Sequence, residues 1–207
     1  MILIYIHGFN SGYHPGGYKI VSLQKIAKVT GVSYDSFAVH DEVIRALGEQ
    51  LDDKLAPFRP LYDQSGLPKA ALAGTSLGGY WAARFGSHFG IPAVLVNPTI
   101  HPQRSLQRYV GHKLLNFVTR DRNILRKEVP ASYDDIEREG DFLILLDKGD
   151  EVLDYREAVE WFAGETADTG THGCNIITFE GGSHRFEHMD ESLPHILKFL
   201  KHQPLSP

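Results

Sequence analysis

A single serine stands between two glycines in the segment Gly74-Thr75-Ser76-Leu77-Gly78. The segment follows an apolar run and precedes a helix-like stretch, which is the setting that a G-x-S-x-G nucleophile elbow requires. On so sharp a turn the flanking positions have little room for a Cβ atom, and the hydroxyl is held clear of the sheet beside a helix N-terminus. The pattern predicts that Ser76 is a nucleophile for acyl transfer.

Two other interpretations of the same segment are a plain strand-to-helix turn and a phosphate-binding loop. The chain contains neither G-x-G-x-x-G nor Gly-Lys-Ser/Thr, which argues against the phosphate loop. A plain turn is distinguished from a nucleophile elbow by the helper residues, because a serine alcohol reacts poorly until a base takes its proton.

In this architecture the helpers follow in the order Ser, Asp or Glu, His, each after a strand. The segment "DKGDEVLDYREAV" follows the apolar run at residues 142–146 and holds several carboxylates. Asp150 is favoured as the triad acid because it lies beyond Gly149 in the exposed loop. Asp147, at the edge of the strand, would cap the turn. Asp154 is the second choice, because with Glu157 it resembles a helix N-cap and its capping-box partner.

The general base is sought after the last predicted strand, in "EGGSHRFEH". The chain has 11 histidines, so a histidine in a loop is by itself a weak signal. His184 is chosen because it follows that strand after a Gly-Gly turn, as the elbow architecture requires. His188, one helical turn further along, is the fallback.

The oxyanion hole is expected in "HGFNSG", residues 7–12, directly after the first apolar run. In hydrolases of this class a His-Gly loop supplies a backbone N–H beside the nucleophile. The amides of Phe9 and Leu77 are therefore predicted to bind the developing oxyanion. His7 is predicted to orient the loop through hydrogen bonds rather than to act as an acid or base.

These residues need a scaffold in which strands and helices alternate. Apolar runs predict buried strands at residues 2–6, 32–37, 70–73, 93–96, 142–146 and 175–179, and helical periodicity predicts helices at 17–29, 41–55, 76–88, 154–162 and 193–201. Long polar loops are expected at 57–69 and 164–173. This alternation predicts an α/β fold with a mostly parallel sheet of about six strands and helices on both faces.

Composition narrows the class of protein. The 207 residues suit one domain, and a net charge of −5 gives no global field for nucleic acid or an anionic membrane. Cys174 is the only cysteine and cannot form an internal disulfide. No secretory signal and no membrane span is visible at "MILIYIHGF", so a cytoplasmic, bacterial protein is expected.

Several segments together resemble the small bacterial YqiA-type esterases of the α/β-hydrolase superfamily. They are "YIHGFNS", "GTSLGGYWA", "VNPTIHP", "GDEVLDYREAV" and "EGGSHRFE", spread over most of the chain. The resemblance implies an α/β-hydrolase fold without the first two strands of larger relatives, and esterase activity with no cofactor or metal. It also implies Ser76 as nucleophile, Asp150 as acid and His184 as base. The loop at 164–174 and the segment "GYHPGGYK" depart from the family pattern, so substrate preference is not carried over.

The expected function is a serine esterase that hydrolyses a small-molecule acyl ester or thioester through an acyl-enzyme. Alternatives are a peptidase, a C–C bond hydrolase, a perhydrolase, or a non-catalytic protein that keeps the fold to bind a ligand or partner. Substrate-binding residues and oligomeric state are left open.

A long segment at residues 100–140 is predicted to be a helical, lid-like insertion. Its part at 101–127 carries seven Lys and Arg residues against one acid, Asp121. This bias fits a patch for an anionic leaving group such as the phosphates of an acyl-CoA. The favoured interpretation is the solvated face of an amphipathic helix.

Overall fold

Six parallel strands form the central sheet, in the order β2-β1-β3-β4-β7-β8. The computed structural model describes residues 1–163 and 174–201. The strands are β1 (Ile2–Ile6), β2 (Lys28–Val32), β3 (Ala70–Thr75), β4 (Ala93–Val96), β7 (Phe142–Asp147) and β8 (Cys174–Phe179). Because the strands run in parallel, their carboxyl ends meet at one edge of the sheet, where ligands bind in open α/β folds.

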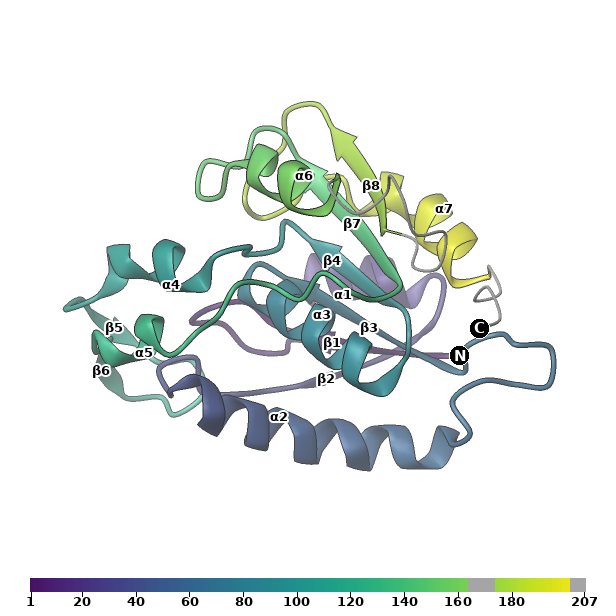
Figure 1. Cartoon of the computed structure of the whole chain (residues 1–207), viewed down its shortest axis with the longest axis horizontal. Helices are drawn as coiled ribbons and strands as arrows, with labels where there is room; N and C mark the ends of the chain where they lie inside the picture. Colours follow the sequence, from purple (N-terminus) through teal and green to yellow (C-terminus); the bar gives the residue numbers. More distant parts are fainter. Residues whose placement is uncertain (164–173, 202–207) are drawn as a thin grey trace.

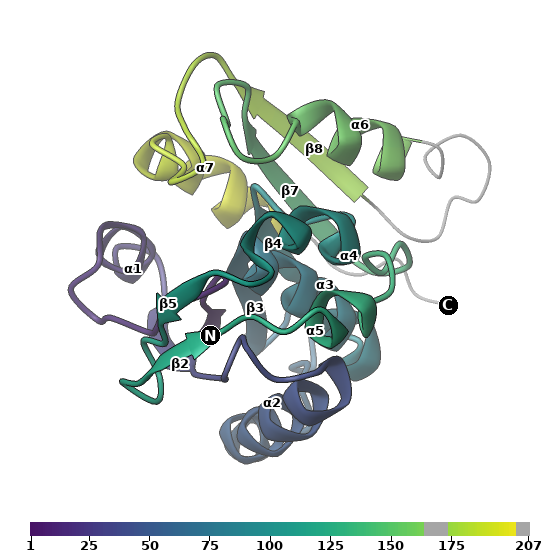
Figure 2. The same ribbon diagram turned by 90° about the vertical axis from the view of Figure 1, so that its left-hand side faces the viewer.

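The alternation of side chains along each strand produces two hydrophobic cores, one on each face of the sheet. Figures 1 and 2 show the helices that cover the two faces. On one face, Ile2, Ile4 and Ile6 pack with α2 (His40–Leu55), α3 (Leu77–Phe89) and α6 (Tyr155–Ala163). On the other face, Leu3 and Tyr5 pack with α1 (Tyr18–Gln24) and α7 (Met189–Leu200). Both faces are therefore covered, as the near-continuous apolar runs of the strands require.

The second strand was placed wrongly by the sequence pattern. The predicted helix at 17–29 ends at Gln24, β2 occupies Lys28–Val32, and residues 33–39 form a loop instead of a strand. β2 is an edge strand with an exposed lysine at its start, so it lacks a continuous apolar run. Tyr34 and Phe37 are buried from the loop, and this produced the misleading strand-like pattern.

The other predicted strands and helices are present. The strands predicted at 2–6 and 93–96 have the predicted bounds, and the ends of the remaining elements are shifted. The last helix begins four residues earlier than predicted, at Met189. The polar loop at 57–69 is present and begins within the short 3-10 turn η1 (Ala56–Phe58). The loop predicted at 164–173 lies outside the described residues.

The segment at 100–140 is only partly helical. It contains α4 (Pro102–Ser105), the 3-10 turn η2 (Leu106–Tyr109), an antiparallel hairpin of β5 (Lys113–Leu115) and β6 (Arg122–Ile124), and α5 (Glu128–Ala131). The single amphipathic helix expected over the basic part is wrong. Asn116 starts a turn there, because its Oδ1 accepts hydrogen bonds from the amides of Val118 and Thr119 at 2.9 and 3.2 Å.

In the described ranges, none of the helices has the length and apolar character needed to cross a membrane.

Candidate active site

Ser76 occupies the sharp corner between β3 and α3. Its φ of 56° and ψ of −124° lie in a region that favours glycine, which costs about 1–3 kcal/mol at a non-glycine residue. The flanking glycines make the corner possible. A Cβ on Gly74 would lie 2.0 Å from the carbonyl oxygen of Gly78, and one on Gly78 would lie 2.1 Å from that of Ile6. The packing of α3 against β3 and β1 therefore depends on both glycines.

Replacing Gly78 by alanine should destabilise the fold. The added methyl group meets backbone atoms that cannot rotate away, so we expect the free energy of unfolding to fall by about 2 kcal/mol or more in urea titrations. Gly16→Ala is the matched control, because a Cβ at Gly16 has no heavy atom within 4 Å. Equal stability of the two variants would contradict the close approach.

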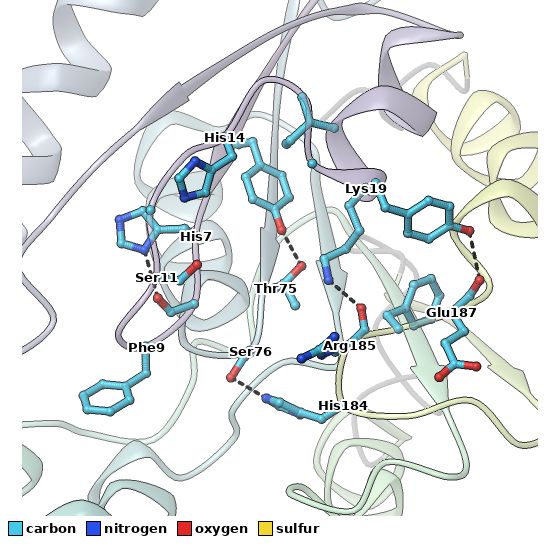
Figure 3. A pocket seen from close by; sticks show the side chains of 17 residues that line it. His7, Phe9, Ser11, His14, Lys19, Thr75, Ser76, His184, Arg185 and Glu187 are labelled. Atoms are coloured by element: carbon cyan, nitrogen blue, oxygen red, sulfur yellow. Dashed lines mark hydrogen bonds between the residues drawn. The ribbon is translucent and has the colours of Figure 1, made fainter. Parts of the chain in front are cut away.

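Three predicted site residues lie in one chain of hydrogen bonds (Figure 3 shows the Ser76–His184 part). The Nε2 of His184 lies 3.1 Å from the Oγ of Ser76. The Nδ1 of His184 lies 2.8 and 3.0 Å from the two carboxylate oxygens of Asp150. The Asp150 side chain is only 2% exposed, against 23% for His184. A buried carboxylate thus fixes the orientation of a ring whose far nitrogen faces solvent and Ser76.

Asp150 is itself held in place by its loop. Its Oδ1 accepts hydrogen bonds from the backbone amides of Val152 and Leu153 at 2.8 and 2.9 Å. Asp154, the second choice, contacts Arg156 instead, including its amide in the first turn of α6, which agrees with an N-cap. The arrangement therefore brings Asp150 to the histidine and leaves Asp154 on the helix.

A second aspartate–histidine pair stabilises the loop after β8, which carries His184. The Nδ1 of His188 lies 2.7 Å from Oδ1 of the fully buried Asp147. The other oxygen of Asp147 accepts hydrogen bonds from the amides of Ser183 and Glu187 at 3.2 and 2.8 Å. Because His188 is paired with Asp147 and not with Ser76, the fallback choice of base does not fit the structure.

Two positioning residues were missed from the sequence. Asn97, buried at the end of β4, donates from Nδ2 to the carbonyl of Ser183 at 3.0 Å and accepts from the amide of Asp147 at 2.9 Å. Glu151 accepts a hydrogen bond from the amide of His184 at 3.0 Å, and this bond holds the pKa of Glu151 below its usual range. Asn97 could have been identified from the sequence, because it is a polar residue directly after a predicted buried strand.

His7 has the contacts of a structural residue. Its Nε2 accepts a hydrogen bond from the amide of Tyr34 at 3.3 Å, so Nδ1 carries the proton and donates to the carbonyl of Gly8 at 2.9 Å. Its ring stacks on Tyr34 with centroids 4.6 Å apart. Burial lowers the pKa of His7, which keeps the ring neutral.

The loop after β1 packs closely against Ser76. A Cβ on Gly8 would lie 3.0 Å from the carbonyl oxygen of Thr75 and 3.3 Å from the Cβ of Ser76. In the described part of the chain, neither the Phe9 amide nor the Leu77 amide donates a hydrogen bond to another residue. Both N–H groups are therefore available to a ligand.

Ser76 and His184 open into a pocket of about 660 Å³. Figure 3 shows its lining, which comes from the loop after β1, from α1 and from the loop after β8. Tyr5 and Thr75 lie beneath it, joined by a hydrogen bond of 2.7 Å. Across residues 1–163 and 174–201, no three His, Cys, Asp or Glu side chains are grouped so that they could hold a metal ion.

Comparison with known proteins agrees with this architecture. Residues 2–201 match the model of a family described as "Uncharacterised protein family (UPF0227)". A UPF0227 protein of Vibrio parahaemolyticus is 28% identical over 210 residues, covering 96% of this chain and 98% of the relative.

Two solved structures are similar in fold. An α/β superfamily hydrolase from Oenococcus oeni has a TM-score of 0.62 at 14% identity, covering 97% of this chain and 93% of its own. An esterase from Pyrococcus furiosus has a TM-score of 0.59 at 16% identity, covering 98% and 81%. The six-stranded parallel sheet with its flanking helices is thus an α/β-hydrolase-like fold.

Proposed function

The chain belongs to the UPF0227 family, and we propose that Ser76, His184 and Asp150 form the catalytic triad of a serine esterase in this member. The observation that carries the proposal is the unbroken hydrogen-bond chain from Asp150 through His184 to Ser76 on a strained elbow. The resemblance of the site motifs to YqiA-type esterases and the similarity of the fold to hydrolases support the same reaction class.

In the proposed mechanism, Nε2 of His184 takes the proton of Ser76 as Oγ attacks the acyl carbonyl. The carboxylate of Asp150, hydrogen-bonded to Nδ1, stabilises the imidazolium that forms. The amides of Phe9 and Leu77 donate to the oxyanion, and His184 then returns the proton to the leaving oxygen or sulfur. Water, deprotonated by His184, hydrolyses the acyl-enzyme in the second half of the cycle.

The insertion at 100–140 is proposed to border this site as a cap. Tyr109 stacks on Phe9 with ring centroids 5.0 Å apart, and Arg108 donates to the carbonyl of Val152 at 3.1 Å. The insertion is thereby joined to both the oxyanion loop and the acid loop. The seven cations of its basic part are exposed, and none of them lines the pocket, so they favour a solvated face over a site for the leaving group.

The proposal is tested by hydrolysis of p-nitrophenyl butyrate and of a butyryl thioester. The wild-type protein should release p-nitrophenol in a burst equal to the enzyme concentration whenever deacylation is slower than acylation. Folded wild-type protein that turns over neither substrate, nor longer or shorter acyl chains, would favour the non-catalytic alternative.

A further inference from the structure

Two cationic side chains extend into the pocket beside Ser76. Lys19 comes from α1, and Arg185 comes from the loop after β8, next to His184. The Lys19 ammonium donates a hydrogen bond to the backbone carbonyl of Arg185 (Figure 3). The two cations therefore share the pocket that also holds the serine and the histidine.

Neither cation has a carboxylate partner. In the described part of the chain, no ion pair involves Lys19 or Arg185. Asp147 attracts Lys19, but its oxygens are occupied by His188 and by two backbone amides. Glu187 is exposed, and Figure 3 shows its carboxylate at the far side of the drawing from Ser76. Glu151 interacts electrostatically with Arg185, but its carboxylate accepts the amide of His184. Within the described residues the two cations are therefore only partly balanced, and neither has a carboxylate in direct contact.

The proximity of the two cations has an electrostatic cost. Burial, followed by repulsion from Arg185, lowers the pKa of Lys19 to about 8, while the attraction of Asp147 opposes the shift. A bound anion would accept hydrogen bonds from both groups and reverse this repulsion. The lining also includes the side chains of Phe9 and Tyr18, which are not buried and are available to contact a carbon chain.

From this geometry we propose that Lys19 and Arg185 bind an anionic group of the substrate, a carboxylate or a phosphate, while Ser76 attacks the ester carbonyl of the same molecule. The substrate class is therefore an ester that carries a negative charge away from the scissile bond. This inference rests on the proposed esterase function.

The test compares three p-nitrophenyl esters whose acyl chains have the same length and end in a carboxylate, a phosphonate or a neutral N-methylamide. For the wild type, kcat/KM should be about tenfold to a hundredfold higher for an anionic ester than for the amide. The preference should fall to near unity in Lys19→Met and Arg185→Gln. The more favoured anion identifies the natural group. A purely structural role for Lys19, joining α1 to the loop, would lower kcat/KM for all three esters alike.

Lys25→Met is the matched control. Lys25 lies at the end of the same helix, is exposed, pairs with Asp190 at 2.7 Å and does not line the pocket. It should keep the wild-type preference.

The preference for the carboxylate ester over the amide-bearing ester should also decline as pH rises through about 8, because Lys19 loses its charge there. The ratio between these two esters cancels every effect of pH that they share. His14 and Glu187 also line the pocket, so Lys19→Met must abolish this decline.

The outcomes separate the two proposals. Ser76-dependent hydrolysis that is equally fast for all three esters would overturn the anion site and leave the esterase in place. If none of the three is hydrolysed, calorimetric binding to Ser76→Ala decides the anion site. Tighter binding of the carboxylate or phosphonate ester than of the amide, lost in a Ser76→Ala/Lys19→Met variant, supports it. Equal binding overturns it.

Discussion

Replacing Ser76 by alanine should lower kcat for ester hydrolysis by about a millionfold, the loss seen when the nucleophile of a working serine triad is removed. The reason is that the acyl-enzyme cannot form without Oγ, which lies 3.1 Å from Nε2 of His184. The fold should be retained, because within residues 1–163 and 174–201 the hydroxyl has one further hydrogen-bond partner, Thr99, at 3.5 Å. The positive φ at position 76 also costs alanine no more than it costs serine.

The matched control for this loss is the double variant Ser76→Ala/His184→Ala. Because the two groups act as a unit, the double variant should be no slower than either single variant. Steady-state rates should be measured on one activated ester at high enzyme concentration, with circular dichroism to verify folding. A folded Ser76→Ala variant with more than about a tenth of the wild-type rate would show that another group attacks the ester.

Replacing Asp150 by asparagine should lower kcat by about ten-thousandfold with little change in KM. The amide has the same shape, but it cannot stabilise the imidazolium, and its NH₂ group would favour the wrong tautomer of His184. The near-complete burial of the carboxylate, at 2% exposure, keeps water from taking its place. Pre-steady-state kinetics should show that acylation is the slowed step.

Glu151→Gln is the control for this prediction. Glu151 contacts the backbone amide of His184, and the glutamine carbonyl can still accept that bond. We expect its rate to fall less than about tenfold, since the ring of His184 is not touched. Equal losses in Asp150→Asn and Glu151→Gln would indicate that the loop as a whole, and not the carboxylate beside Nδ1, controls the rate.

The scaffold was largely readable from the sequence because buried parallel strands are continuous apolar runs. The strands at the centre of the sheet, such as β3 and β4, follow that rule. β2 does not, since it is an edge strand, and the buried loop residues Tyr34 and Phe37 imitated a strand beside it. The segment at 100–140 was misjudged because the apolar spacing of a short hairpin resembles that of a helix. The turn at Asn116 depends on a hydrogen bond to the side chain of that one residue, and the pattern of apolar residues does not reveal such a bond.

The contacts of the candidate triad were predictable for a different reason. Ser76, Asp150 and His184 each follow a strand, and parallel strands deliver the residues after them to one edge of the sheet. Residues whose contacts join two elements distant in the sequence are not marked by a position directly after a strand. Lys19 stands on a short helix whose end was predicted wrongly, and its place opposite Arg185 depends on how α1 packs beside α7.

The most direct test of the central claim is labelling with a fluorophosphonate, followed by mass spectrometry of the peptides. A serine activated by a neighbouring imidazole reacts covalently with the probe, whereas an ordinary surface serine does not. The wild type should gain one adduct, located on Ser76. The adduct should be absent in Ser76→Ala and should form far more slowly in His184→Ala. A folded wild-type protein that remains unlabelled, or that carries the adduct on another residue, would contradict the account.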